Sequence, residues 1–592
     1  MQHAPGARKN AFYSKIVLWL CFAAMAWGNL IFYPRWEKPG SESTIAWDVE
    51  GYYWYLPSLF IFKDLQKQEF KDSILNKYKA SPANRFIHGF VHEKSGNYVL
   101  KYSSGMAVLY SPAFFTGHMA AKALGYDADG FSIPYKLSLQ LWGLLFSFIG
   151  LFYLRRLLLL YYEDKVTAIV LFLLVLGTNY FNYAAIDVGM SHSWLFTIYV
   201  FILLNTHFFY TSGKARYLYR VGFLTGLTVL IRPTEIIAVL IPALWGLESV
   251  SSLKQRFSFL AGRWKTVLIA ACCAVPPIAL QLVYWKYVSG EWFVYSYQEQ
   301  GFNWIRPHAF VYSWSYRAGW LRYAPMMLLA FVGLLFYWRH GRNKLAVILF
   351  FVLNYYIVSA WNVWDYGGFS GRAMIQSYPI LVFPIATLIA LALRKKWSSF
   401  ILAPFILLFL YANIWFTYQA HGGGLLDAWG TTPAYYRKIA GRWSVPKEYE
   451  KLKDTDELFE GKPKSAHIMY RSQDTRLFCV TKERHSAEAV VLPASLATGQ
   501  WIRVAADFQC VQKEWDVWQF PELVVKFTKG NEEQKVRFIR VGRFIEEGET
   551  KRLYMDMKVP EAAAESIKVS LYNVESDKKM CMRHLEVSTF NE

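Results

Sequence analysis

The sequence predicts an α-helical polytopic membrane protein that carries a β-sandwich domain at its C-terminal end. Three observations lead to this fold class. The chain has 592 residues, of which 54% are hydrophobic and 18% aromatic, and this is too apolar for one soluble domain. Apolar runs of about 17–25 residues, enough to cross the hydrocarbon core of a bilayer, recur along residues 1–420. Beyond them the chain changes to short segments in which polar and apolar residues alternate.

The apolar runs predict about eleven membrane spans. The segment 104–124 is also apolar, but Pro112, His118 and Lys122 lie within it, so we expect it to lie at the outer interface. Ala24-Met25-Ala26 is similar to a signal-peptidase site, yet the apolar run continues beyond it, which favours an uncleaved anchor. The spans are expected near 14–33, 133–154, 165–184, 190–211, 216–231, 233–249, 264–288, 319–338, 343–361, 374–393 and 398–418.

The formal net charge of +20 lies mainly in short loops between these spans. If the N-terminus is cytoplasmic and eleven helices cross, every one of these basic loops is cytoplasmic, as the positive-inside rule requires. The positive charge therefore indicates which loops are cytoplasmic, and nucleic acid is not an expected partner. The basic residues are Arg8, Lys9, Lys15, Arg155, Arg156, Lys214, Arg216, Arg220, Lys254, Arg256, Arg263, Lys265, Arg339, Arg342, Lys344, Arg394, Lys395 and Lys396.

The domain organisation follows from the same patterns. Residues 1–420 form the transmembrane region, with large external loops at 34–132 and 289–318. A connector at 421–445 begins with HGGG, and residues 446–592 form the β-sandwich, which an odd number of spans places outside the membrane. In that external domain Cys479, Cys510 and Cys581 allow one disulfide and leave one thiol over. No cysteine spacing indicates zinc.

The first external loop contains the most informative stretch, IAWDVEGYYWYLPS at 45–58. Asp48 and Glu50 are two residues apart, so a helix would point them in different directions, whereas an extended segment or a turn would let them converge. One could then act as a base while the other orients an acceptor, a metal or the loop. Trp47, Tyr52 and Tyr53 would hold the loop at the membrane interface.

Other polar residues also gather on the predicted outer side. Ionisable groups are costly near lipid, so this asymmetry indicates a functional cavity, although each residue could instead face solvent at a helix end. They are His88, His92, Lys101, Tyr102, Asp187, His192, Arg232, Glu235, Tyr297, Glu299, Gln300, Arg306, Arg317, Asp365, Arg372 and Gln376.

Transfer of a sugar from a polyprenyl-phosphate carrier fits these groups. Nucleotide sugars and ATP are cytoplasmic, so an external site needs a donor that the membrane delivers already activated. A phosphate leaving group needs cations, and the acceptor needs one carboxylate as general base. Two alternatives stay open: a transporter or flippase of lipid-linked sugars, and a non-catalytic scaffold for envelope-glycan assembly.

The chain resembles the GT-C superfamily of polytopic glycosyltransferases, in particular bacterial relatives of protein O-mannosyltransferases and the lipid A aminoarabinose transferase. Those relatives typically have adjacent Asp-Glu where this chain has Asp-x-Glu. The resemblance rests on WDVEGYYWYLP (47–57), KYSSGMAVLYSP (101–112), GLTVLIRPTE (226–235), GEWFVYSYQEQGF (290–302), GWLRYAPM (319–326) and WNVWDYGGFSGRAMIQSYP (361–379).

This resemblance implies an inverting hexosyl- or pentosyl-type transferase in the cytoplasmic (inner) membrane, with Asp48 as general base and Glu50 beside it. The C-terminal sandwich looks like a carbohydrate-binding module. No required cofactor is inferred, a divalent metal at the acidic pair stays open, and no metal ligand is assigned. The expected partners are membrane lipid, the lipid-linked donor and an envelope acceptor. The donor phosphate is expected at Lys101, Arg372 and Arg232, and the substrates at Tyr52, Tyr53, Tyr102, His192, Tyr297, Glu299 and Asp365.

Two structural alternatives apply to the central residues. Asp48 could cap a helix or loop, a role that asparagine would fill as well. Arg372 could be a loop arginine paired with Asp365.

Overall fold

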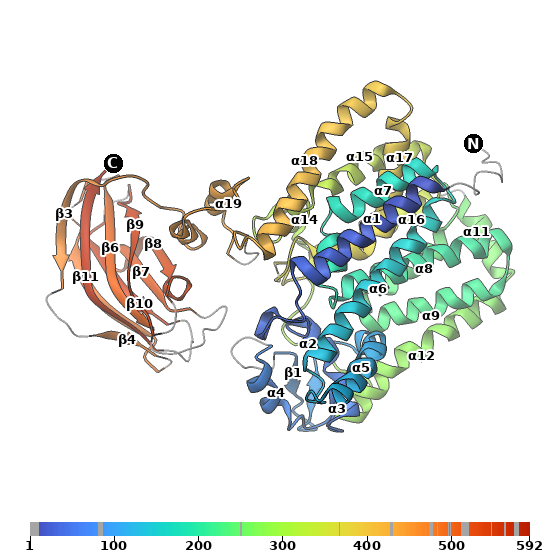
Figure 1. The fold of residues 1–592 in the computed structure, drawn as a ribbon, viewed down its shortest axis with the longest axis horizontal. Helices are drawn as coiled ribbons and strands as arrows, with labels where there is room; N and C mark the ends of the chain where they lie inside the picture. The colour runs from blue at the N-terminus through green and yellow to red at the C-terminus, as the bar shows by residue number, and fades with distance from the viewer. Residues whose placement is uncertain are drawn as a thin grey trace. The chain divides into compact units, whose positions relative to one another are not determined.

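In the computed structural model the chain divides into two compact units, Met1–Trp429 and Gly430–Glu592 (Figure 1). The first unit is helical and the second is built mainly from two β-sheets, which confirms the predicted fold class. Arg8 and Lys9 lie outside the described residues. The structure describes residues 11–592 except 81–86, 249–251, 366, 427–429, 473–476, 482, 495, 498, 511–519, 546–547, 562–563 and 574–578.

Long helices form most of the first unit, and short helices lie in its loops. The short ones are α2 (Asp48–Tyr53), α3 (Tyr55–Phe60), α4 (Lys71–Tyr78), α10 (Leu240–Leu244), α11 (Leu253–Ala261), α13 (Ala309–Trp314) and α14 (Trp320–Tyr323). The long ones are α1 (Phe12–Trp27), α5 (Gly105–Leu124), α6 (Ile133–Leu158), α7 (Asp164–Gly177), α8 (Ser191–Ser212), α9 (Ala215–Ile231), α12 (Trp264–Ser289), α15 (Leu328–His340), α16 (Lys344–Ala360), α17 (Tyr378–Ala392) and α18 (Lys396–His421).

Six of the described helical segments are long and apolar enough to cross a membrane: Phe12–Phe32, Ile133–Leu158, Ser191–Ser212, Trp264–Ser289, Arg372–Ala392 and Lys396–His421. The chain is therefore a multi-pass membrane protein. Each of the eleven predicted spans coincides with helical structure, but the count of eleven is not established by these lengths. The predicted span 319–338, for example, is divided into α14, a 3₁₀ turn at Pro325–Met327 and α15, because proline cannot donate the hydrogen bond that would continue the helix.

Several helix ends follow from the local sequence. Helix α6 has Pro134 in its first turn, where the missing N–H costs nothing, and Arg155 and Arg156 in its last turn, where they complement the helix dipole. Helix α8 ends at Gly213, which adopts a left-handed φ of 70° that glycine accepts without strain.

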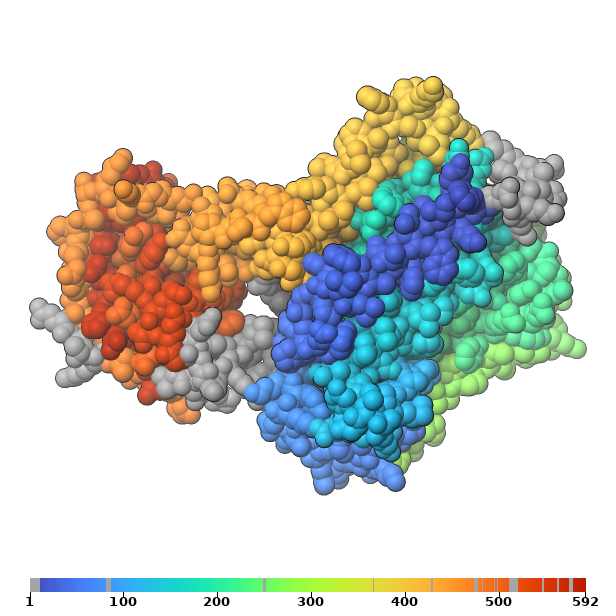
Figure 2. Space-filling view, viewed as in Figure 1, coloured from blue at the N-terminus to red at the C-terminus, as the bar shows by residue number. Residues whose placement is uncertain are grey.

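Several helices of the first unit pack on partners that are distant in the sequence. Helix α1 packs on α7 and runs along the surface of its unit (Figure 2). Helices α9 and α12 lie side by side (Figure 1), and their backbones approach closely at Gly226, where an added Cβ would overlap Ala274. Within lipid there is no hydrophobic driving force between helices. Small residues let the two backbones approach closely, and the resulting van der Waals packing holds the helices together.

The second unit contains a β-sandwich that follows a short helix, α19 (Pro433–Ile439). One sheet has the order β5-β10-β7-β8 and the other β3-β11-β6-β9, with β4 paired to β11. Apolar residues of both sheets form one buried core. The strands are β3 (Lys464–Arg471), β4 (Phe478–Val480), β5 (Ser486–Pro493), β6 (Trp501–Cys510), β7 (Glu522–Lys529), β8 (Glu532–Arg540), β9 (Thr550–Lys558), β10 (Ser566–Tyr572) and β11 (Met580–Asn591).

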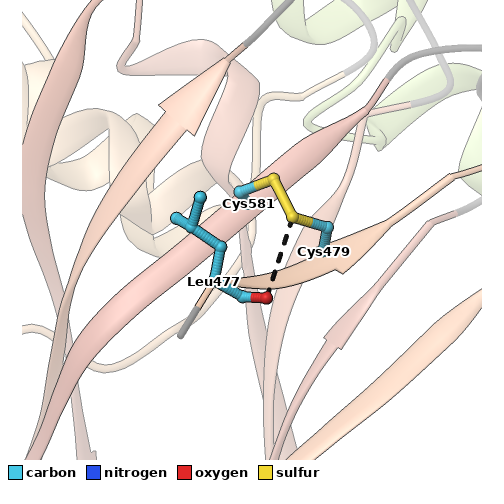
Figure 3. The surroundings of a disulfide bond; sticks show 3 residues. All are labelled: Leu477, Cys479 and Cys581. Atoms are coloured by element: carbon cyan, nitrogen blue, oxygen red, sulfur yellow. Dashed lines mark hydrogen bonds between the residues drawn. A yellow bond between two sulfur atoms is a disulfide. The ribbon is translucent and has the colours of Figure 1, made fainter. Parts of the chain in front are cut away.

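A disulfide joins two neighbouring strands of this sandwich. Cys479 of β4 is bonded to Cys581 of β11, and the Cys479 sulfur lies 3.9 Å from the carbonyl oxygen of Leu477 (Figure 3). Cys510, at the end of β6, is the buried thiol that is left over. The sequence allowed one bridge among these three cysteines, and the strand pairing selects this one.

Candidate functional site

The stretch around Asp48 folds as a short helix, not as the extended segment or turn in which the two carboxylates would converge. Helix α2 begins at Asp48, and Glu50 follows within it. Trp47, directly before the helix, has a φ of 52°, a conformation that costs a residue with a side chain about 1–3 kcal/mol. Consequently the two carboxylates of the motif contact different partners.

The carboxylate of Asp48 is held by two side chains from distant parts of the chain. Its Oδ1 accepts a hydrogen bond of 2.7 Å from the hydroxyl of Tyr102, and its Oδ2 lies 2.5 Å from Nη2 of Arg372. Neither hydrogen bond goes to a helix N–H, so capping is not the role that these contacts indicate. The Asp48 side chain is 22% exposed and that of Arg372 is 13% exposed, which leaves the pair accessible to a ligand.

The surroundings of Asp48 keep it ionised. Burial by itself would raise the pKa of Asp48, but the Arg372 guanidinium and the Tyr102 hydroxyl outweigh it, and Lys101 adds to their effect, so the pKa lies below its ordinary value of 3.8. Opposite charges and hydrogen bonds to the charged form both favour ionisation. Asp48 is therefore a carboxylate at neutral pH, the form that a general base requires.

Glu50 faces a histidine instead of the Asp48 cluster. It is fully buried, and its Oε2 lies 3.5 Å from Nε2 of His88. Burial lowers the pKa of His88 to about 4, so its imidazole is neutral at pH 7. His88 also lies beside Tyr102, with ring centroids 5.7 Å apart. Glu50 therefore helps to position His88 and, through its ring, Tyr102, which hydrogen-bonds to Asp48.

The aromatic residues of the motif divide into two groups. Tyr52 contacts Tyr102, with ring centroids 4.5 Å apart, and so lies at the cluster. Tyr53 points into the core, where its hydroxyl donates to the carbonyl of Gly130. Between Glu50 and these tyrosines, Gly51 leaves the space that the Tyr102 ring fills, since an added Cβ would lie 2.6 Å from it.

Lys101 contributes a second cation close to Asp48. Its ammonium lies 5.6 Å from the ring centroids of both Tyr102 and Tyr297. Burial lowers the pKa of Lys101, and the negative charge of Asp48 opposes that shift. Ser296 donates a hydrogen bond of 2.6 Å to the carbonyl oxygen of Lys101, which connects the loop at 289–318 to the first external loop.

A buried chain of hydrogen bonds lies behind Arg372. Nδ1 of His192 contacts Oε1 of Gln376 at 3.0 Å, and Gln376 donates to Glu235 at 2.9 Å. Glu235 also accepts a hydrogen bond of 2.6 Å from Tyr199. His192 and Gln376 come from the first turn of α8 and from the 3₁₀ segment Arg372–Ser377, respectively.

Arg232 is the third predicted phosphate ligand and lies near the same chain. Its guanidinium and that of Arg372 both act electrostatically on His192, and Arg232 also acts on Tyr297. Lys101 and Arg372 both act on Asp48. The three predicted phosphate ligands, which are spread over 272 positions of the sequence, therefore belong to one region of the fold.

Two of the predicted substrate residues have other surroundings. Asp365 pairs with Arg317 at 3.0 Å, so the alternative in which it pairs with Arg372 is wrong. Glu299 is exposed, and its described contact is a hydrogen bond that its backbone carbonyl accepts from Asn362.

The structure also adds residues that received no role from the sequence. Tyr199 lies within an apolar helix and gives no local signal, whereas the sequence marked His88, Glu235 and Gln376 only as polar residues on the predicted outer side. Among the residues that the structure describes, no three side chains of metal-ligand type converge.

No family model and no curated protein matches this chain. Among solved structures, it is similar to the archaeal oligosaccharyltransferase AglB from Archaeoglobus fulgidus in complex with an inhibitory peptide and a dolichol-phosphate (TM-score 0.40, 11% identity, 76% of this chain and 61% of that chain). It is also similar to the apo form of the Archaeoglobus fulgidus oligosaccharyltransferase (0.40, 14%, 76% and 62%). A third similar structure is the arabinosyltransferase EmbB from Mycobacterium smegmatis (0.30, 12%, 97% and 64%).

The alignments with these three structures thus cover less than two thirds of each of those chains. With such low identities and scores, a functional assignment for this chain rests on the contacts of its own residues.

Proposed function

We propose that this protein is a membrane glycosyltransferase that moves a sugar from a polyprenyl-phosphate donor to an envelope acceptor. The observation that carries the proposal is the contact of the Asp48 carboxylate with Arg372 and Tyr102, with Lys101 beside them. A carboxylate for the acceptor and cations for a phosphate leaving group are the two requirements of this reaction.

In the proposed reaction, Arg372 exchanges one anionic partner for another. When the donor binds, its phosphate pairs with the Arg372 guanidinium, which can donate hydrogen bonds to two phosphate oxygens at once. The carboxylate of Asp48 loses its closest positive charge and becomes a stronger base. The ion pair of the free protein thus keeps the base weak until the donor is present.

Asp48 then accepts the proton of the acceptor hydroxyl or amine. The acceptor atom forms a bond to the anomeric carbon of the sugar while the bond from that carbon to the phosphate oxygen breaks. The electron pair stays on the phosphate, where Arg372, Lys101 and Arg232 stabilise the charge. Attack opposite to the leaving group inverts the anomeric configuration. Tyr102 holds Asp48 in place through its hydrogen bond.

The location that we propose is the cytoplasmic membrane, with the N-terminus inside and the site outside. The ends of the helices support this sidedness: Ser14 near the start of α1 accepts a hydrogen bond from Arg155 at the end of α6, whereas the first turn of α8 lies at the Asp48 site. Residues of the predicted cytoplasmic loops are thus separated from the site by the length of the helices. The C-terminal sandwich would be external and could bind carbohydrate.

A transporter or flippase fits these contacts less well. That class builds its binding site near the middle of the membrane from broken helices, whereas Asp48, His192 and Arg232 lie at helix ends. A non-catalytic scaffold would leave the Asp48–Arg372 contact without a chemical role.

The test is sugar transfer by purified protein with a labelled polyprenyl-phosphate sugar. Asp48→Asn keeps the hydrogen bond from Tyr102 but removes the base, so turnover should fall about 10²–10⁴-fold while donor binding persists. Near-normal turnover by a folded Asp48→Asn protein would exclude Asp48 as the base and favour the scaffold.

Arg372→Ala should lower kcat/KM for the lipid donor about 10²-fold or more, and Arg372→Lys should recover only part of the loss because an ammonium is a point charge. Arg306→Ala, at an exposed arginine of the loop at 289–318, is the matched control and should retain activity. Equal losses in the Arg372 and Arg306 variants would contradict a specific phosphate contact.

A further inference from the structure

A separate cavity of about 660 Å³ lies between α6, α8 and α9, three helices that run side by side (Figure 1). Its wall is partly apolar and partly cationic. Tyr153, Phe201 and Leu204 belong to the apolar part, while the cationic part consists of Arg155, Arg156 and Arg220.

This cavity is remote from the Asp48 site. Phe208, which lines it, follows His192 by more than four turns of α8, or about 24 Å along the helix axis. On α9, Arg220 lies at the cavity, about 16 Å along the axis from Ile231, which Arg232 of the site directly follows. The cavity therefore lies at the other end of the helices, near the predicted cytoplasmic surface.

The arginines of the cavity are only partly occupied by contacts within the protein. Arg155 donates from Nε to Ser14 and from Nη2 to the carbonyl of Ala11. Arg156 and Arg220 are exposed. Arg156 lies 5.3 Å from the ring centroid of Tyr153, a cation–π contact that leaves the N–H groups at the edge of the guanidinium available to an anion.

The charge of the cavity is uncompensated along its described lining. The lining contains three arginines and, among the residues that the structure describes there, no aspartate or glutamate. Asp164 acts electrostatically on Arg155, and its carboxylate accepts backbone hydrogen bonds from Tyr13 and Ser14. An anion entering the cavity would meet a net positive charge next to an apolar wall.

We propose that this cavity binds the phosphate headgroup of an anionic membrane lipid, with the start of an acyl chain against its apolar wall. Phosphate matches the guanidinium groups, and basic pockets between membrane helices at the cytoplasmic side are suited to such headgroups. The apolar residues and the volume exceed what inorganic phosphate needs, which favours a lipid over the free ion. The site is independent of the proposed transferase reaction.

The experiment measures lipid binding by the purified full-length protein with native mass spectrometry. Phosphatidylglycerol is the probe, and phosphatidylcholine and inorganic phosphate are the comparison ligands. Wild-type protein should bind phosphatidylglycerol more tightly than either. In the double variant Arg156→Gln/Arg220→Gln, its affinity should fall about 10- to 30-fold. Arg339→Gln, at an exposed arginine of α15 outside the cavity, should bind like the wild type.

Two outcomes would overturn the proposal. One is equal affinity of the wild type for phosphatidylglycerol and phosphatidylcholine, and the other is binding of inorganic phosphate as tight as that of the lipid. Because both substituted arginines are exposed and glutamine is a good helix former, the double variant should fold; its thermal unfolding midpoint checks this. If a folded double variant retains wild-type affinity, the cavity is not the lipid site.

Discussion

Asp48 and Arg372 are 324 positions apart in the sequence and form one ion pair in the fold. If the donor phosphate takes Arg372 away from Asp48, the pKa of Asp48 should be higher in the substrate complex than in the free protein. The acid limb of kcat reports the complex and that of kcat/KM the free protein.

We therefore expect kcat to begin falling at a higher pH than kcat/KM as the solution is made acidic from pH 8 to pH 4. In the free protein the pKa of Asp48 lies below its ordinary value, so any limb of kcat/KM from this residue should lie at the acidic end of this range. Steady-state rates at several donor concentrations measure both profiles. Coincident limbs, or a kcat limb at the lower pH, would contradict the exchange of partners.

The buried His88 should make the stability of the fold depend on pH. Burial lowers its pKa from 6.5 to about 4, so between these values the unfolded state binds more protons than the folded state. A group of this kind destabilises the fold as the pH falls from 6.5, and the loss is complete near pH 4. The expected loss is about 3 kcal/mol for a shift of this size.

The measurement is the thermal unfolding midpoint of the purified protein in detergent between pH 7.5 and pH 4.5. His88→Gln should show a weaker dependence on pH than the wild type. His340→Gln, at an exposed histidine at the end of α15, should keep the full dependence. A His88→Gln protein with an unchanged slope would mean that other groups cause the effect.

At the scale of the element, helix α2 depends on Gly51. A methyl group there would lie 2.6 Å from the Tyr102 ring and 2.8 Å from Cγ of His88. Gly51→Ala should therefore displace Tyr102 from Asp48, lower stability by about 1–3 kcal/mol and reduce turnover.

Gly301→Ala is the control, because an added Cβ there meets nothing closer than 3.8 Å. Chemical denaturation and sugar transfer, measured on both variants, test the prediction. A Gly51→Ala protein as stable and active as Gly301→Ala would show that Tyr102 can move without consequence.

At the scale of the whole molecule, the disulfide of the second unit bears on the cellular compartment in which that unit lies. Cys479 and Cys581 enclose a long loop, with a sequence separation of 102, and such a bridge usually contributes about 2–5 kcal/mol to a secreted domain. Disulfides persist in oxidising compartments, so the bridge should be present in cells if the sandwich is external.

Mass-tagged maleimide on non-reduced and reduced samples from whole cells should reveal two cysteines that react only after reduction. Cys479→Ser should remove this difference and lower the unfolding midpoint of the protein. Full reactivity of both cysteines without reduction would contradict the proposed external location.

The class of the molecule could be predicted from the sequence because it depends on local properties. Hydropathy over about 20 residues identifies helices that suit a bilayer, and alternation with a period of two identifies strands. The helical unit and the C-terminal sandwich follow from such windows. Asp48, Lys101, Arg232 and Arg372 also stand out as charges beside apolar runs, whereas their expected roles as base and phosphate ligands come from the family resemblance.

The pairing of these residues was decided only by the tertiary structure. Asp365 is seven positions from Arg372, yet Arg372 pairs with Asp48 and Asp365 with Arg317. The helix at Asp48 separates the two carboxylates, and the pairing of β4 with β11 joins Cys479 to Cys581. Each outcome depends on segments brought together by packing over the whole unit, and a local pattern does not contain that information.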